Sequence, residues 1–228
     1  MKFVHSLALL TAFLTLSGFH AEDTFTLRQK YKKDDVQVYL ANLSIIADDS
    51  VVEMEMKTSY KVLAADDDGA FELEETLLSG TFKFNGEEHA MDKGEPKTNK
   101  YDKDGSKIKK DGEEDEEDPV SDAIDDVFEY EPKQAVKVGE TWKHDGKFGV
   151  ATLTLEGREK VEEVNCLKIT LKGTMDKKGA SGDVTATFLI REDDFSPVVM
   201  EAKMDNPKLD SDTPPMKKIE VKMKRTKD

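Results

Sequence analysis

Apolar and polar residues alternate with a period of two along most of the chain after residue 35. In the longest run, residues 51–62, one side carries Val52, Met54, Met56, Thr58, Tyr60 and Val62. The residues between them are all charged or hydroxylated. Because successive side chains of a strand point to opposite faces of a sheet, this run predicts a long strand with one buried and one solvated face, as antiparallel sheets have.

Shorter runs repeat the alternation, and turn-forming residues separate them. The runs are Val36-x-Val38-x-Leu40, Phe82-x-Phe84, Ala151-x-Leu153-x-Leu155, Val184-x-Ala186-x-Phe188-x-Ile190, Met200-x-Ala202-x-Met204 and Ile219-x-Val221-x-Met223. The turn formers are Asp66-Asp67-Asp68-Gly69, Asn85-Gly86, Asp104-Gly105, Glu156-Gly157 and Lys177-Lys178-Gly179. This order of strands and hairpin turns predicts an all-β, mainly antiparallel fold of about ten or eleven strands, curved into an open or nearly closed half-barrel.

One short helix is expected among the strands, from Asp118 to about Tyr130. Asp118 is suited to cap the first free amides, and Pro119 fits the first helical turn. Apolar residues then follow at helical spacing, at Val120, Ile124, Val127 and Phe128. Such a helix either covers one end or face of the sheet as a lid or plug, or links two groups of strands at the surface.

Residues 87–118 are rich in charges of both signs and end in the acidic run of residues 113–118. Like charges placed this closely repel each other and favour extended, solvated chain. Strands are expected on both sides of the segment, so we interpret it as a charged, partly flexible insertion in a single domain of residues 22–228. The alternative is a division into two domains near residue 118.

The N-terminus has the features of an export signal. Lys2 provides a positive charge, residues 7–16 are apolar except for two threonines, and small and polar residues lead to Ala21. This order is typical of a secretory signal peptide, and the apolar run has about half the length that a membrane-spanning helix needs. We therefore expect a signal peptide at residues 1–21 and a periplasmic or extracellular protein without a transmembrane span. A buried N-terminal helix is the alternative.

Net charge and cysteine content limit the classes of function that are open to the protein. The chain has 34 basic and 49 acidic residues, a formal net charge of -15, which argues against nucleic acid as a partner, because phosphate binding needs a basic surface. Cys166 is the one cysteine and lies on the strand side opposite to Leu167, Ile169 and Leu171. We expect a structural thiol, with a reactive thiol or a link between two chains as alternatives.

Tests for catalytic and metal chemistry give no site. The aspartate-rich turns place Ala64 and Lys100 where a calcium loop needs its first carboxylate. After the leader the histidines are His89 and His144, and His144 is expected in a polar surface turn. The sequence lacks a serine-hydrolase elbow, a glycine-rich phosphate loop and a zinc signature. We therefore predict no catalytic residue, no metal ligand and no cofactor.

Methionine and aromatic residues share the apolar sides of the expected strands. Methionine adapts to irregular apolar partners, and concave apolar surfaces are where small ligands bind. We predict that a cavity for an apolar or lipid-like ligand is lined by Met54, Met56, Tyr60, Phe82, Phe84, Trp142, Phe188 and Met200. The plainer alternative is the ordinary core of a large sheet.

Four segments carry a family resemblance: Tyr31 to Val36, Asp102 to Ile108, Val136 to Trp142 and Asn165 to Ile169. With them the chain resembles an uncharacterised family of exported bacterial β-rich proteins, similar in outline to the curved half-barrels of periplasmic lipoprotein carriers. The resemblance implies a fold and a compartment, and it brings no activity or functional residue.

Together these features predict an exported, non-enzymatic envelope protein that binds an apolar or lipid-like molecule or a protein partner of the envelope. One alternative is a secreted hydrolase that uses a pair of carboxylates. Another is a structural or weakly calcium-responsive acidic envelope protein that acts through residues 111–118.

Overall fold

The computed structural model describes residues 23–103, 107–108, 119–128, 131–132, 134–177, 179–209 and 215–226. The predicted leader and the acidic run 113–118 lie outside these residues. The first eight strands are β1 (Thr24–Phe25), β2 (Val36–Ile46), β3 (Val51–Ala65), β4 (Phe71–Phe84), β5 (Glu87–Ala90), β6 (Lys97–Tyr101), β7 (Lys107–Ile108) and β8 (Val136–Lys137). The others are β9 (Thr141–Asp145), β10 (Gly149–Val161), β11 (Val164–Met175), β12 (Ser181–Arg191), β13 (Pro197–Lys208) and β14 (Lys218–Thr226), and the helix is α1 (Pro119–Phe128).

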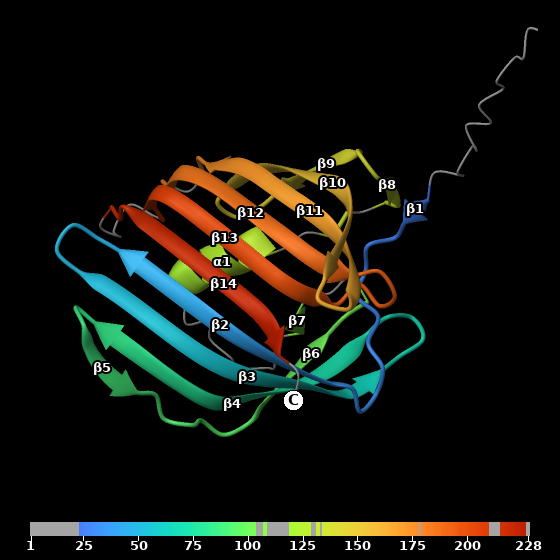
Figure 1. Ribbon diagram of the computed structural model, residues 1–228, viewed down its shortest axis with the longest axis horizontal. Coiled ribbons are helices and arrows are strands. Elements are labelled where there is room, and N and C mark those ends of the chain that lie inside the picture. The colour runs from blue at the N-terminus through green and yellow to red at the C-terminus, as the bar shows by residue number, and fades with distance from the viewer. Residues whose placement is uncertain are drawn as a thin grey trace, which may run out of the picture.

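Twelve strands form one sheet in the order β7-β6-β4-β3-β2-β14-β13-β12-β11-β10-β9, with β5 also paired to β4 (Figure 1). All of its described strand pairs are antiparallel. The path ends at β7 and β9, which do not pair with each other, so the sheet is open. Strands β1 and β8 form a separate two-stranded sheet. The predicted all-β, open half-barrel with one short helix is confirmed.

The sheet has one apolar and one polar face, as the alternation predicts. Directly paired residues lie on the same face, so the strand register defines a continuous row across the sheet. On the apolar face this row contains Leu153, Leu171, Ala186, Ala202, Val221, Leu43, Met54 and Phe82. On the polar face the neighbouring row contains Lys172, Thr185, Lys203, Glu220, Ser44, Glu53 and Lys83.

Helix α1 lies on the apolar face, over the strands of the C-terminal half of the chain. Ala123 and Val127 are buried in the same core cluster as residues of β10 to β14, and Val120, Ile124 and Phe128 pack against that cluster. Figure 1 shows the helix behind these strands. Of the two arrangements that the sequence left open, the structure has the helix packed on one face of the sheet. No helix in the described part of the chain has the length and apolar character to cross a membrane.

Among the predicted turns whose residues the structure describes in full, Asp66 to Gly69 and Asn85-Gly86 are found as turns and Glu156-Gly157 is not. Asn85 and Gly86 have φ angles of 50° and 90° and join β4 to β5, as a tight hairpin with two positive φ angles requires. Glu156-Gly157, predicted as a turn, instead lies inside β10 at a register shift in its pairing with β11. The chain reverses later, between Val161 and Val164.

Two further details differ from a simple reading of the pattern. The run Val36-x-Val38-x-Leu40 lies on the polar face of the sheet. Tyr39, Ala41 and Leu43 alternate with this run and lie on the apolar face. Part of the segment 87–118 is ordered as β5, β6 and β7, which pair with β4 or with each other.

Candidate functional site

The burial of the apolar face differs between the two halves of the sheet. In the row defined above, the residues of β10 to β14 are buried: Leu153, Leu171, Ala186, Ala202 and Val221 are 0–8% exposed. The same row continues into β2, β3 and β4 with Leu43, Met54 and Phe82, which are only half-buried. We call the half-buried group the open patch: Leu43, Ile45, Val52, Met54, Met56 and Phe82. The apolar face therefore continues beyond the part that α1 covers.

A carboxylate of α1 joins the helix to the β9–β10 hairpin. Asp126 Oδ1 lies 3.1 Å from His144 Nε2 and accepts the backbone N–H of Lys147 at 2.9 Å, and its Oδ2 accepts the N–H of Phe148 at 3.2 Å. Although burial alone would raise the pKa of Asp126, these hydrogen bonds outweigh it and lower the pKa. His144 was expected in a surface turn, but it lies in β9 with 16% of its side chain exposed, because the helix packs over it.

Beyond the C-terminal end of α1 lies a cavity of about 300 Å³, which we call the aromatic cavity. It is lined by Arg28, Gln29, Tyr31, Gly69, Phe71, Leu73, Tyr101, Phe128, Glu131, Pro197 and Met200. Three rings from three segments stack on one another, with centroids 3.9 Å apart for Tyr31 and Phe71 and 4.7 Å apart for Phe71 and Tyr101. Its volume is at the lower end of the range of small-molecule sites, about 300–1,000 Å³.

The apolar face of β3 continues from the open patch towards the C-terminal end of the strand. Met56, Thr58 and Tyr60 follow one another on the apolar face, and Tyr60 packs edge-on against Tyr39 with ring centroids 5.9 Å apart.

The tyrosine hydroxyls of this region stay protonated. Burial, above all, raises the pKa of Tyr31, Tyr39, Tyr60 and Tyr101. Tyr39 donates to Gln37 Oε1 at 2.8 Å. Tyr31, Tyr60 and Tyr101 have no hydrogen-bond partner among the described residues. In the same part of the chain, every buried side-chain polar atom has a partner, so the hydroxyl oxygens of these three tyrosines are not fully buried. Their hydroxyl groups are therefore open to solvent or to a ligand.

A carboxyl group of the sheet acts on one of the helix. Partial burial first, and then Asp122 and Glu75, raise the pKa of Asp125, which is an exposed residue of α1. Glu75 is paired with Tyr60 and thus lies on the apolar side of β4. Asp125 and Glu75 are the carboxyl pair to which the hydrolase alternative would apply.

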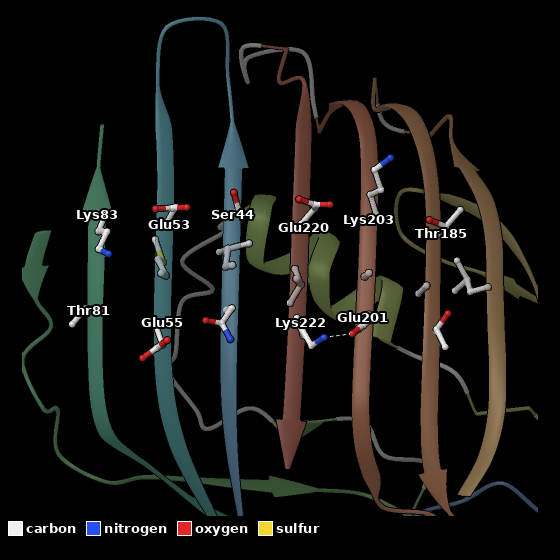
Figure 2. A pocket seen from close by; sticks show the side chains of 18 of the residues that line it. Ser44, Glu53, Glu55, Thr81, Lys83, Thr185, Glu201, Lys203, Glu220 and Lys222 are labelled. Carbon is white, nitrogen blue, oxygen red and sulfur yellow. Dashed lines mark ion pairs between the residues drawn. The ribbon is translucent and has the colours of Figure 1, made fainter. Parts of the chain in front are cut away.

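A groove of about 960 Å³ lies on the polar face. Figure 2 shows Ser44, Glu53, Glu220, Lys203 and Thr185 pointing to one side of the sheet, with the helix on the far side. Charged neighbours pair within the groove, with Lys222 Nζ 2.5 Å from Glu201 Oε1 and Lys83 Nζ 3.1 Å from Glu88 Oε2. Exposed pairs of this kind are typical of a solvated outer surface, and the groove has no aromatic lining residue.

The structure separates the residues predicted to line a ligand cavity. Met54, Met56 and Phe82 belong to the open patch, Tyr60 lies between that patch and the aromatic cavity, and Met200 lines the aromatic cavity. Phe188 is fully buried and Trp142 packs against the same core, while Phe84 is 47% exposed at the end of β4. All eight predicted residues therefore lie on the apolar face of the sheet, where Met54, Met56, Tyr60 and Phe82 are half-buried. Met200 belongs to the buried core and borders the aromatic cavity. The role of these residues in binding stays a prediction.

Sequence reasoning did not select Arg28, Tyr31, Phe71, Tyr101 or Phe128 for this cavity. Tyr31, Phe71 and Tyr101 come from the N-terminal segment, β4 and β6, so no local spacing connects them. The one available signal was the concentration of tyrosines in the first half of the chain.

Cys166 is free and buried, with none of its surface exposed. It lies on the face opposite to Leu167, as predicted, next to its strand neighbours Glu159 and Arg191. Burial raises the pKa of the thiol and disfavours the reactive thiolate. We expect a thiol reagent such as Ellman's reagent to leave the folded protein unmodified and to titrate one thiol per chain after unfolding. Rapid reaction with the folded protein would contradict a structural role.

The other candidates from the sequence give little further chemistry. His89 stacks on Phe82, with ring centroids 5.2 Å apart. The acidic run of residues 113–118 lies outside the described residues, as does the turn Asp104-Gly105. Within the described ranges, no group of three or more His, Cys, Asp or Glu side chains is arranged to hold a metal ion.

These features define the class of protein: an open antiparallel half-barrel with a helix on one half of its apolar face and a cavity at the helix end. No protein-family profile matches the chain, and no curated protein matches it. Among solved structures, it is similar to a domain from Vibrio parahaemolyticus described as outer membrane lipoprotein-sorting, with a TM-score of 0.24, 6% identity, and coverage of 86% of this chain and 85% of that one. It is also similar to a DUF1329 family protein from Desulfovibrio piger, with a TM-score of 0.24, 13% identity, and coverage of 85% and 84%.

At these identities and TM-scores, the likeness carries no argument about ligand or partner.

Proposed function

We propose that the protein binds an apolar or amphiphilic molecule between α1 and the open patch, and that it does so outside the cytoplasm as a non-enzymatic carrier. The observation that carries this proposal is the apolar row that runs from Leu153 to Phe82 and is buried only as far as Val221. Contiguous apolar surface of this kind usually marks a binding site. Location outside the cytoplasm is inferred from the predicted leader.

The chemistry of the open patch supports a flexible apolar ligand. Met54 and Met56 have unbranched side chains that adapt to chains of different shape. Leu43, Ile45 and Phe82 add apolar area, and the aromatic cavity gives the far end of the ligand a place with polar groups. A ligand that lies along β3 would complete the cover that α1 gives to the other half of the face.

Binding can be tested with the neutral fluorescent probe N-phenyl-1-naphthylamine and the delipidated protein. We expect saturable binding, and we expect Met54→Gln to weaken it about fivefold to tenfold, because a polar amide replaces one or two methylene-sized apolar contacts. The matched control is Glu55→Gln, which changes the next residue of β3 on the polar face and should leave binding unchanged. Equal effects of the two variants, or no saturable binding by the wild-type protein, would contradict the proposal.

A further inference from the structure

We propose that the aromatic cavity holds the anionic end of the ligand, a carboxylate or phosphate group, against the guanidinium of Arg28. This inference rests on the proposed binding of an amphiphile and adds the chemical class of its head group. The apolar part of the same molecule would leave the cavity along Tyr60, Thr58 and Met56 towards the open patch.

The guanidinium of Arg28 lies close to the backbone of the β3–β4 turn. Gly69 has a φ of 99°, and a Cβ atom there would lie 3.2 Å from Arg28 Nη2 and 3.4 Å from its Cζ. The glycine therefore serves both the turn and the close approach of the guanidinium. The half-buried side chain of Arg28 thus packs against this turn, and Arg28 lines the cavity together with Tyr31 and Phe71.

Among the residues that the structure describes, none neutralises the positive charge of Arg28. No ion pair or side-chain hydrogen bond joins it to any other described residue. Glu131 also lines the cavity, but its Oε1 accepts the backbone N–H of Gln29 at 3.2 Å, which ties it to the chain next to Arg28. A guanidinium without a partner in a partly closed cavity favours an anion, and its planar set of donors fits a carboxylate or a phosphate.

The surrounding charge agrees with an anionic ligand. Four of the six residues from Arg28 to Lys33 are basic, in a chain whose net charge is -15. Lys30 packs over the Phe195 ring at 5.0 Å, while Lys32 and Lys33 are exposed. This short basic segment at the cavity raises the local concentration of anions that the rest of the acidic surface repels.

The tyrosines supply neutral donors next to the charge. Tyr31 and Tyr101 line the cavity and have hydroxyl groups that remain protonated and accessible. A protonated phenol donates to an oxygen acceptor without adding negative charge. Guanidinium and phenol groups around one small volume thus form a set of donors for an anionic oxygen group.

Displacement of bound N-phenyl-1-naphthylamine by four twelve-carbon compounds tests the inference: dodecanoate, dodecyl phosphate, dodecanol and dodecylamine. We expect the two anions to displace the probe at about tenfold lower concentration than the alcohol, because a charge-assisted contact to Arg28 is made only by them. Arg28→Gln should abolish this preference and leave dodecanol unchanged. The matched control is Arg158→Gln, because Arg158 pairs with Asp23 and Glu192 outside the cavity.

The possible results separate this inference from the proposed function. Equal displacement by dodecanoate and dodecanol, or stronger displacement by dodecylamine, overturns the anionic site while the proposed carrier role stands. Failure of the wild-type protein to bind the neutral probe overturns both. If Arg28→Gln does not fold, as judged by circular dichroism, the wild-type preference for the anions must fall as salt is raised, because salt screens an accessible charge pair, and a preference independent of salt would overturn the inference.

Discussion

Replacement of Phe188 by alanine is expected to lower the free energy of unfolding by about 3–5 kcal/mol. The side chain is fully buried at the centre of the apolar face of β12. Its ring packs edge-on against Phe128 of α1, with centroids 6.2 Å apart. The substitution therefore leaves a cavity in the sheet core and removes an aromatic contact of the helix.

Urea unfolding followed by circular dichroism measures this loss. The matched control is Phe84→Ala, which makes the same substitution on the apolar side of β4, where the ring is 47% exposed. We expect the control to cost less than about 1 kcal/mol, because little area is withdrawn from water there. Similar losses in the two variants would mean that α1 does not close the covered half of the face.

Asp126→Asn is expected to destabilise the protein by about 2–3 kcal/mol, although it changes one atom. The carboxylate accepts two backbone N–H groups and meets His144, and only 15% of its side chain is exposed. An asparagine has one acceptor oxygen and presents an NH₂ group in place of the other, so one of these partners loses its acceptor. Since these contacts hold α1 on the β9–β10 hairpin, the variant should also bind more of the hydrophobic dye ANS.

The neighbouring residue on the same helix gives the control and the pH dependence. Asp125→Asn should cause no loss or a small gain in stability, because burial and nearby carboxylates penalise the charge at this position. The pKa of Asp126 is lowered by folding, so its contribution is present above the unfolded pKa of about 3.9 and is lost as the pH falls through the folded value. Unfolding followed from pH 6 to pH 3 should show this acid loss reduced in Asp126→Asn, and an unchanged profile would contradict the role of the carboxylate.

The local structure of this protein could be predicted where one segment contains the whole signal. The residues of β3 alternate on both faces as predicted, and β12 buries Val184, Ala186, Phe188 and Ile190. The helix was predicted from Pro119 and the spacing of the apolar residues after it. Gly157 shows the limit of such reasoning. A glycine in the sequence is compatible with a turn or with an irregularity inside a strand, and in this protein Gly157 lies at a register shift in the pairing of β10 with β11.

The candidate site could be predicted only in part. Met54, Met56 and Phe82 were selected because they lie on the apolar side of strands, and this placement is correct. The same reasoning selected Phe188 and Trp142, which pack in the core, because period-two alternation identifies the buried side of a strand but does not reveal which part of that side the helix will cover.

The amino-acid sequence by itself determined the strands, their apolar and polar sides, most of the turns and the position of the helix, since each depends on residues close together in the chain. Only the tertiary structure decided that α1 covers β10 to β14 and leaves the open patch, and that Arg28, Tyr31, Phe71 and Tyr101 meet at one cavity. These features come from contacts between segments that are far apart in the chain. The energies of such contacts depend on packing across the whole sheet, so the sequence of any one segment contains no periodic pattern that reveals them.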